Sequence, residues 1–400
     1  MATAYVNSGL QLKPRTDTLC RLCGAATRIV ADLGVIPASN AYTNRPILDI
    51  DRVPIALCSC VKCGFVALTD TVSPSTLYGQ NHELTGKLMS GYHAEYGSWV
   101  KNYVGSISNP YIVDIGSNDG GFLSGFQKDG WTVLGVEPAD EPWAASMRSN
   151  IPAHQGFFTR EWIADRYLSH TSHRPNVITA NRVWANVEDV VGASWAVAEL
   201  LAGNGYFFIE TGYLPPIVDK MLIETIYPEH ISYDLLTPLV SFFKRFGLEV
   251  VDAYESNAKG GSLRVIVRHE GHRVQESNIK AILKKEDLWL NSDPWTHFRD
   301  RIDSERQGLQ GKLYGKVAGY GAGVPGIALT HYLGLEETLV WIVDDAATDQ
   351  GKYMPGTNIQ VTENGRLKEA DTCVILAHRY AKQIQSKNTG FSKWLVPFHK

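Results

Sequence analysis

The stretch of sequence that decides the fold is Ile112-Val113-Asp114-Ile115-Gly116-Ser117-Asn118-Asp119-Gly120-Gly121-Phe122. The β-branched run from Tyr111 to Ile115 predicts a short, buried strand. The glycines that follow predict a tight turn, because residues without a Cβ tolerate positive φ and let backbone amides approach a ligand closely. A helix is then expected from Phe122 to Lys128.

Two acidic residues at strand ends turn this pattern into a predicted nucleoside site. Asp114 lies at the carboxyl end of the first strand, and Glu137 ends the next apolar run, Val133 to Val136. A carboxylate at the second place can accept hydrogen bonds from both ribose hydroxyls. The residues expected to bind the cofactor are Asp114, Gly116, Asn118, Gly120, Phe122, Glu137, Pro138 and Asn181.

The turn also indicates which nucleoside binds. A dinucleotide site needs the pattern G-x-G-x-x-G to hold a pyrophosphate, whereas this turn reads D-I-G-x-N-x-G-G, with an acid before its first glycine. The pattern favours a positively charged nucleoside without phosphates, so we predict S-adenosylmethionine (SAM). An NAD-type site and a tight turn without a ligand are the alternatives.

Length and composition set the class of protein. Four hundred residues suffice for two or three domains, and 44% hydrophobic with 20% charged residues is typical of a globular protein. A formal charge of −4 without a basic run argues against nucleic-acid binding. No membrane span is expected, and Met1 to Arg15 lack the apolar core of a signal peptide. We therefore expect a cytoplasmic protein with free thiols.

Five of the six cysteines precede residue 64, and four of them form two C-x2-C pairs, Cys20/Cys23 and Cys60/Cys63. Four thiolates are the tetrahedral donor set of a structural zinc site, which leaves no position for water. The long separation of the pairs predicts an intervening loop built from turn-rich material such as Leu33 to Pro37. Cys58 is an alternative to Cys60 as third ligand, and Cys373 is expected in the core.

Further strand ends extend the predicted sheet, at Asn176 to Asn181 and at Gly205 to Glu210. Alternating strands and helices predict a doubly wound α/β domain. The later cluster Tyr227-Pro228-Glu229-His230 can offer a base, an orienting carboxylate and a hydroxyl donor, although a surface loop could carry the same residues by chance. A carboxylate beside His230 would raise the pKa of the imidazole and fix its tautomer.

The carboxyl-terminal third repeats the strand-and-glycine design. After a helical region from Ile279 to Leu313, Lys316 to Gly323 predicts a strand with a glycine turn, and Leu339 to Val343 and Thr372 to Ala377 predict further strands. The G-x-G-x-G turn alone could bind a diphosphate. It supports the main rival hypothesis, an NAD(P)-dependent oxidoreductase, and a non-catalytic zinc scaffold is a third.

In this order, the landmarks resemble the sugar C-methyltransferases that act on nucleotide-activated 4-keto-deoxysugars. The supporting motifs are the cysteine pairs, Val113 to Gly120, Ile226 to His230, Gly260-Gly261-Ser262-Leu263-Arg264, Gly319 to Ala322 and Gly351 to Thr357. The resemblance implies an α/β protein with a class I SAM methyltransferase Rossmann-like domain between a small zinc-binding domain and a second Rossmann-like α/β domain. The expected boundaries are 1–80, 81–270 and 271–400.

The resemblance also implies a mechanism. His230 would be the base that removes the proton next to the ketone, with Tyr227 and Glu229 assisting, and the enolate carbon would attack the sulfonium methyl group. Tyr227 would donate a hydrogen bond to the developing oxyanion. The implied partner is a nucleotide-linked ketosugar, and its expected contacts are Lys259, Arg264, Tyr320, Gly321, Ala322 and Lys352.

Three positions depart from the family pattern. Lys259 stands where the family usually has a histidine before the glycine pair, Asn186 replaces another common histidine, and Asn81-His82-Glu83-Leu84 lacks an aromatic pair usual after Tyr78. All three should lie near substrate or cofactor. They leave open the sugar, its nucleotide and the methylated carbon, and also a methyltransferase on a different acceptor.

Overall fold

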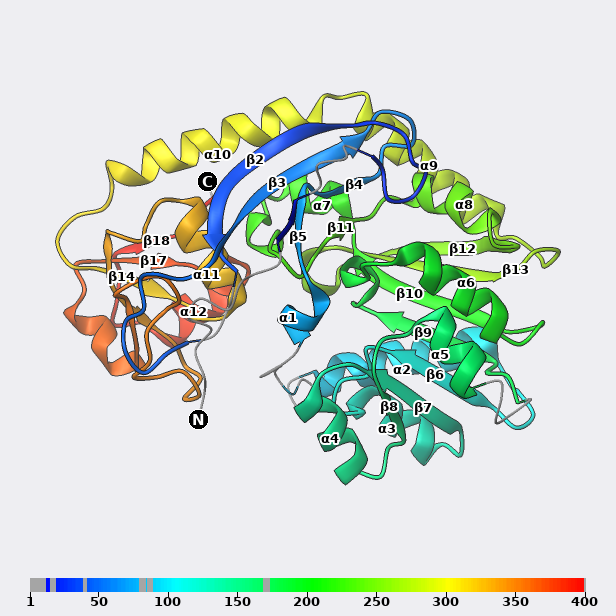
Figure 1. Ribbon diagram of the computed structural model, residues 1–400. Coiled ribbons are helices and arrows are strands. Elements are labelled where there is room, and N and C mark those ends of the chain that lie inside the picture. Colours follow the sequence, from blue (N-terminus) through cyan, green and yellow to red (C-terminus); the bar gives the residue numbers. More distant parts are fainter. Residues whose placement is uncertain are drawn as a thin grey trace.

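The computed structural model describes residues 12–14, 19–38, 42–78, 84, 89–167 and 173–398. Asn81 to Glu83, and Met1 to Arg15 apart from residues 12–14, lie outside these ranges. The described chain builds three sheet-based units (Figure 1): an amino-terminal one in blue, a central one in cyan and green, and a carboxyl-terminal one in orange and red. No helix in the described part of the chain combines the length and the apolar character needed to cross a membrane.

The central unit is a seven-stranded sheet of order β12-β13-β10-β9-β6-β7-β8. The strands are β6 (Tyr111–Ile115), β7 (Thr132–Glu137), β8 (Ala153–Gln155), β9 (Val177–Asn181), β10 (Tyr206–Gly212), β12 (Leu248–Ser256) and β13 (Ser262–His269). The first five strands are parallel, and β13 is antiparallel to both β10 and β12. The predicted doubly wound α/β architecture is confirmed.

Helices cover both faces of this sheet, and that explains the apolar strands. All five residues of β6 are buried, as expected for a parallel strand with helices above and below. The helices around the sheet are α2 (Ser90–Val104), α3 (Gly121–Lys128), α4 (Asp140–Arg148), α6 (Val190–Leu200), α8 (Leu236–Lys244) and α9 (Glu276–Leu290). Because the strands are parallel, their carboxyl ends meet at one edge, where ligands of such folds bind.

The amino-terminal unit is a four-stranded antiparallel sheet of order β11-β4-β3-β2. Its strands are β2 (Thr27–Pro37), β3 (Arg52–Cys60), β4 (Val66–Leu68) and β11 (Ser232–Tyr233), and a separate pair joins β1 (Leu12–Pro14) to β5 (Asp70–Val72). The loop predicted from Leu33 to Pro37 is wrong, since these residues are part of β2. The pairing register shifts between Asp32 and Val35, where Gly34 adopts φ +94°. Beyond this irregularity Ile36 continues the pairing with β3.

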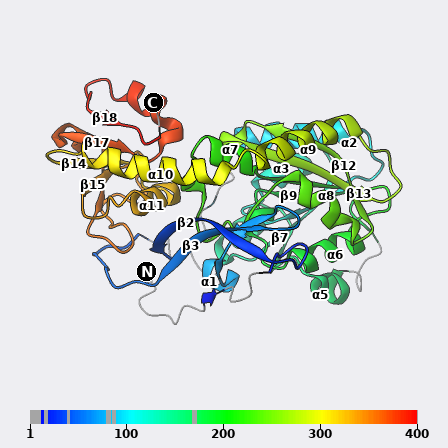
Figure 2. The same cartoon turned by 90° about the horizontal axis from the view of Figure 1, so that it is seen from above.

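The carboxyl-terminal unit is a parallel sheet of order β16-β15-β14-β17-β18. It comprises β14 (Val317–Tyr320), β15 (Leu339–Val343), β16 (Gln360–Thr362), β17 (Thr372–Ile375) and β18 (Trp394–Leu395), with helices α11 (Val324–Tyr332) and α12 (Ala381–Lys387). The predicted second Rossmann-like unit is therefore confirmed. The helical region before it is two helices, α9 and α10 (Pro294–Gln310), and α10 reaches from the central unit to this sheet (Figure 2).

The three units meet around the segment that carries His230. Directly after it, β11 pairs with β4 of the amino-terminal sheet, and the amide of Leu68 donates to the carbonyl of Ile231. From the carboxyl-terminal unit, the Tyr332 hydroxyl donates to the carbonyl of Ile226. The amide of Ile231 donates to the carbonyl of Ala185 in the central unit, so residues from all three units fix this short segment.

Candidate active site

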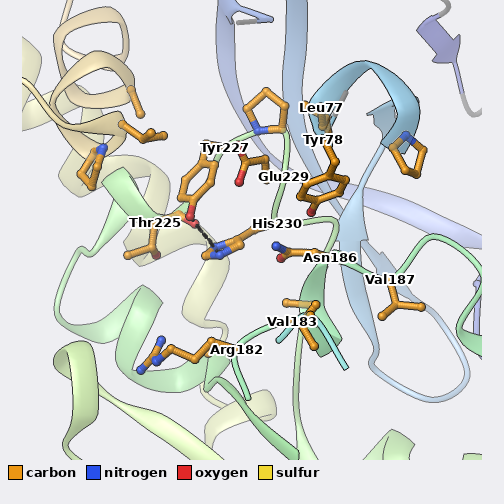
Figure 3. A pocket seen from close by; sticks show the side chains of 18 of the residues that line it. Leu77, Tyr78, Arg182, Val183, Asn186, Val187, Thr225, Tyr227, Glu229 and His230 are labelled. Carbon is orange, nitrogen blue, oxygen red and sulfur yellow. Dashed lines mark hydrogen bonds between the residues drawn. The ribbon is translucent and has the colours of Figure 1, made fainter. Parts of the chain in front are cut away.

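A cavity of about 1230 Å³ lies between the three units. Its wall includes Gly116 and Glu137 of the central unit, Tyr42 of the amino-terminal unit and Lys352 of the carboxyl-terminal unit. Sites for one drug-sized ligand typically measure roughly 300–1,000 Å³, so this cavity has room for more than one such molecule. Figure 3 shows the part of the cavity around His230.

The glycine turn after β6 forms one wall. Gly116, at φ +70°, donates its amide to the carbonyl of Val136 at 2.8 Å, and a Cβ here would lie 2.7 Å from Val183 Cγ2. Gly116 and Asn118 both line the cavity, as predicted for cofactor contacts. Gly120 does not line it; a Cβ there would lie 2.7 Å from Ser146 Oγ, so this glycine is required by packing.

Glu137 ends β7 with its carboxylate fixed by backbone amides. Oε2 accepts from the amide of Asn118 at 2.8 Å and Oε1 from the amide of Ala139 at 2.9 Å. Each oxygen keeps a further lone pair, so both can still accept a ribose hydroxyl. Burial raises the pKa of this carboxyl group. Pro138 and Asn181 line the cavity as well.

Besides Gly120, two further predicted cofactor contacts, Asp114 and Phe122, do not reach the cavity wall. The Asp114 carboxylate is buried and accepts from Thr179 Oγ1 at 2.5 Å, and burial raises its pKa to about 7. The Phe122 ring packs against Tyr96 and Phe126, with centroid distances of 5.6 and 5.2 Å. Asp114 therefore braces the strand end and Phe122 fills the core under α2.

His230 is held by two hydrogen bonds. Its Nδ1 lies 2.9 Å from the carbonyl oxygen of Thr225, and its Nε2 lies 3.0 Å from the Tyr227 hydroxyl (Figure 3). A carbonyl oxygen can only accept, so Nδ1 carries the proton. Nε2 then holds the lone pair, and the Tyr227 hydroxyl donates to it. The geometry thus fixes the tautomer that a base acting through Nε2 requires.

The environment of His230 differs from the expected one. The predicted carboxylate that orients the ring is replaced by the Thr225 carbonyl, while Glu229 lines the cavity. The pKa of His230 is lowered to about 4, mainly by desolvation and further by Arg182, Lys259 and Arg379, so the expected rise in basicity is wrong. Part of the imidazole surface still faces the cavity. Burial raises the pKa of Tyr227 well above its ordinary value.

The predicted substrate contacts divide into two groups. Lys259, Ala322 and Lys352 line the cavity, whereas Tyr320 and Gly321 do not. The Tyr320 hydroxyl donates to Asp345 Oδ1 at 3.0 Å, and Gly321 adopts φ +109° with no room for a side chain against Ala377. These two residues therefore shape the turn after β14.

Arg264 is also absent from the cavity wall, against the prediction. Its Nε lies 2.5 Å from Glu210 Oε2, its guanidinium is 3.2 Å from Glu95, and it lies over the rings of Tyr96 and Trp99. Both Glu210 and Arg264 are buried. The arginine of the G-G-S-L-R motif is thus a structural partner of a buried carboxylate.

Replacing Arg264 with methionine is expected to lower the free energy of unfolding by about 3–5 kcal/mol, because Glu210 would stay buried without its main partner. Denaturant unfolding measures this loss. Arg268→Met on the same strand is the matched control, since Arg268 donates to the carbonyls of Asn204 and Gly205 and not to a buried acid. Equal losses in both variants would contradict the assignment.

The sequence did not single out several side chains of the cavity wall. Arg182 follows β9 at φ +59° and donates to Ser262 Oγ at 2.6 Å. Arg379, from the carboxyl-terminal unit, pairs with the buried Glu224 at 3.0 Å. Tyr78 and His93 also line the cavity. Only Arg182 had a sequence signal, its place directly after a strand end.

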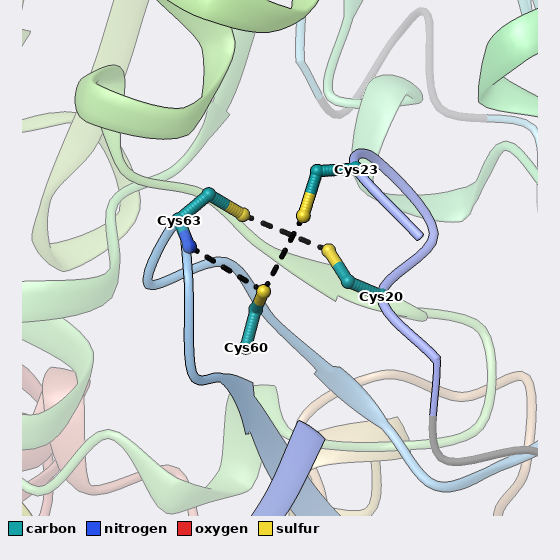
Figure 4. Close-up of side chains that lie close together, drawn as sticks. All are labelled: Cys20, Cys23, Cys60 and Cys63. Carbon is teal, nitrogen blue, oxygen red and sulfur yellow. Dashed lines mark hydrogen bonds between the residues drawn. The ribbon is translucent and has the colours of Figure 1, made fainter. Parts of the chain in front are cut away.

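The four cysteines of the two C-x2-C pairs come together (Figure 4) at the end of the amino-terminal sheet where β2 begins and β3 ends. Their sulfur atoms lie within 4.8 Å of one another, with Cys20–Cys63 at 3.7 Å and Cys23–Cys60 at 3.5 Å. Tetrahedral ligands at about 2.3 Å from zinc stand about 3.8 Å apart, so these separations fit the ion. Cys58 is not part of the cluster, which favours Cys60 as third ligand.

The residues after each pair explain this geometry. Gly24 and Gly64 have φ of +73° and +76°, and their amides donate to the carbonyls of Cys20 and Cys60 at 2.9 and 3.1 Å. The amides of Lys62 and Cys63 lie 3.4 Å from Cys60 Sγ. The turn after the second pair thus directs two backbone amides at Cys60 Sγ, an arrangement that suits a metal-bound sulfur.

Three family models together match most of the chain. Residues 20–78 match "Putative zinc binding domain", residues 90–253 match "Methyltransferase domain", and residues 257–398 match "C-methyltransferase C-terminal domain". The chain is also 26% identical over 400 residues to the C-methyltransferase NovU of Streptomyces niveus, with 94% of each chain covered. The chain belongs to the C-methyltransferase family.

This C-methyltransferase is a SAM-dependent enzyme, with a class I methyltransferase fold between a zinc-binding unit and a carboxyl-terminal α/β unit. Two solved structures each cover less than half of the chain. The glycopeptide N-methyltransferase MtfA complexed with SAM is 12% identical, with a TM-score of 0.34, 44% of this chain covered and 92% of that chain. A geranyl diphosphate methyltransferase in complex with SAM is 10% identical, with a TM-score of 0.36, 44% covered and 85% of that chain.

Proposed function

We propose that this C-methyltransferase transfers the methyl group of SAM to a carbon adjacent to the ketone of a nucleotide-linked keto-deoxysugar. One observation carries the proposal: the glycine turn with Glu137 and the imidazole of His230 line the same cavity. The cavity volume, which exceeds that of a typical single-ligand site, supports a second and sizeable ligand beside SAM. The nucleotide-sugar class itself rests on the motif resemblance.

The residues around the glycine turn would each have a role in binding SAM. Glu137 would accept the ribose hydroxyls, the turn at Gly116 and Asn118 would follow the cofactor backbone, and Pro138 and Asn181 would bound it. SAM supplies an electrophilic methyl group on a sulfonium. The chain's own contribution is to align that methyl group with the acceptor carbon and to exclude water from both.

The acid–base part of the reaction falls to His230. Its Nε2 lone pair would take the proton from the carbon next to the ketone, and the resulting imidazolium would keep its Nδ1 hydrogen bond to Thr225. The Tyr227 hydroxyl occupies that lone pair in the structure. Tyr227 must therefore either move aside or pass the proton on, and Glu229, on the same cavity wall, would assist as the family pattern implies.

The geometry of the carboxyl-terminal glycine turn argues against the rival hypothesis, an NAD(P)-dependent oxidoreductase. The amide of Ala322, which a diphosphate would need, donates to Asp344 Oδ2 at 2.6 Å. A carboxylate at this place repels phosphate. Pro325 follows within the first turn of α11 and offers no amide. The amide of this turn thus already binds a carboxylate of the same chain and is not available to a diphosphate.

Glu137→Gln is expected to weaken the binding of SAM and of its demethylated product S-adenosylhomocysteine by roughly 10- to 100-fold, because hydrogen bonds to a charged acceptor contribute about 1.5–3 kcal/mol. Titration calorimetry measures the dissociation constants. Glu141→Gln on α4, an exposed acid paired with Arg148, is the control and should leave them unchanged. Equal affinities in the two variants would argue against the assignment.

The proposed function is tested by incubating the protein with SAM and a panel of dTDP-, CDP- and GDP-linked 4-keto-6-deoxyhexoses, read by mass. We expect one of them to gain a methyl group that resists acid and base, as a carbon–carbon bond does. Transfer to none of these sugars, with SAM bound normally, would overturn the nucleotide-sugar assignment.

A further inference from the structure

Lys259 has a strained backbone in the cavity wall. It lies in the loop between β12 and β13 at φ +48°, ψ +34°, a left-handed conformation that is uncommon for a residue with a side chain. Such a conformation persists only where the surroundings enforce it. The next residues are Gly260 and Gly261, and a Cβ at Gly261 would lie 2.5 Å from Pro216 Cβ.

Three cationic side chains hold the loop by its carbonyl groups. Arg182 donates to Ala258 at 3.2 Å, Arg379 to Lys259 at 3.0 Å and Lys220 to Gly260 at 2.7 Å. These donors come from three different parts of the chain. The backbone at Lys259 is therefore held in place by distant parts of the fold and not by the loop alone.

The charges around Lys259 are not balanced. Arg182 lies 3.7 Å from Glu210, and Arg379 lies 3.0 Å from Glu224. Lys259 forms no ion pair within 4 Å among the described side chains, and it opens to the cavity. Desolvation, with help from Arg182 and Arg379, lowers its pKa to about 8. An ammonium group in this setting is placed to receive an anion.

The proposed reaction creates an anion at this end of the cavity. Removal of the proton next to the ketone leaves an enolate, and a buried enolate oxygen needs a preorganised donor. The hydroxyl of Tyr227, expected to serve it, has its proton engaged with His230 Nε2. His230 is itself a weak base, so the barrier to proton removal must be lowered mainly by stabilising the enolate.

We propose that the Lys259 ammonium group contacts the ketone oxygen of the acceptor and stabilises the enolate, which makes Lys259 a further catalytic residue of the proposed function. The carbon–hydrogen bond breaks and its proton passes to His230. The electron pair forms the new carbon–carbon bond to the methyl group as the sulfonium becomes a thioether. Lys259 gains and loses no proton, and the ketone is restored.

The electrostatic surroundings of Lys259 give the proposal a pH signature. The charged or titratable groups that influence it or border its loop are Arg182, Arg379, Glu210, Lys220, Glu224, His93 and His230. A lysine with a pKa of about 8 is cationic below that pH and neutral above it. Methyl transfer should therefore fall as the pH rises through about 8. His230 is already neutral across that range.

The test compares Lys259→Met and Lys259→Arg in the full-length, zinc-loaded enzyme with SAM and the ketosugar of the panel that the wild type methylates. Lys259→Met should lower kcat by about 10²–10³-fold with little change in KM, as for the loss of one oxyanion donor. Lys259→Arg should retain more activity and lose the decline near pH 8, since a guanidinium stays charged. SAM affinity and zinc content should match the wild type in both.

Three outcomes would overturn the inference. They are an unchanged kcat in Lys259→Met, a decline near pH 8 that persists in Lys259→Arg, and a rise in KM at constant kcat. The last would assign Lys259 to the diphosphate of the substrate. A wild-type enzyme that methylates no sugar of the panel would be a different result, because it would overturn the proposed function and the inference with it.

Discussion

His230→Gln is expected to lower methyl transfer by about 10²–10⁴-fold, the usual contribution of a positioned base, while SAM still binds with wild-type affinity. The reason is geometric. The Thr225 hydrogen bond leaves the lone pair of His230 on Nε2, which accepts from Tyr227, and glutamine can keep polar contacts there without accepting the proton. Initial rates with SAM and a ketosugar acceptor, together with calorimetry for SAM, separate the two effects.

A second histidine provides the control for this variant. His272 lies 3.0 Å from the carbonyl of Gly203 and is not part of the cavity wall, so His272→Gln should keep wild-type activity. Full activity in His230→Gln would contradict the assignment of His230 as the base. Loss of both activity and SAM binding would instead assign His230 to the folding of its segment.

Cys60→Ser is expected to abolish zinc binding and to destabilise the amino-terminal sheet strongly. Structural zinc contributes apparent binding free energies of about 10–16 kcal/mol in small zinc domains, and three thiolates cannot complete the tetrahedral site. Metal content per chain and thermal unfolding measure the two effects. Cys58→Ser is the matched control, since Cys58 is buried two residues away and lies outside the cluster.

The zinc variant should also lose methyl transfer, although the metal lies outside the reaction. Arg21, between Cys20 and Cys23, donates to Ser232 Oγ at 2.8 Å and to the carbonyl of Val187 at 2.5 Å. Ser232 lies two residues after His230, and Val187 lines the cavity. A Cys60→Ser protein that keeps its zinc and its melting temperature would contradict the four-thiolate site.

The central fold was predictable because its signals are local. The strand from Tyr111 to Ile115 and the turn at Gly116 read directly from apolar runs and glycines, and the parallel sheet follows from their alternation. The amino-terminal sheet could not be predicted in this way. β2 contains a glycine and a proline that resemble a loop, and its strand character comes from pairing with β3, which sequence periodicity does not reveal.

The site was predictable where one segment carries the chemistry, as in Tyr227 to His230 or the two cysteine pairs. It was not predictable where distant elements set the environment. Burial lowers the pKa of His230, and the charges of Arg182, Lys259 and Arg379, from separate parts of the chain, lower it further, opposite to what the adjacent Glu229 indicated. Arg264 was misassigned for a similar reason, since its partner Glu210 lies on another strand.

The central claim is that His230 creates a carbanion next to a ketone inside the SAM cavity. Its most direct test is hydrogen exchange in D2O, with S-adenosylhomocysteine bound so that no methyl transfer can follow, and dTDP-4-keto-6-deoxyglucose as the first acceptor tried. The account predicts deuterium at a carbon adjacent to the ketone with the wild type and none above background with His230→Gln. Equal exchange by both proteins would contradict it.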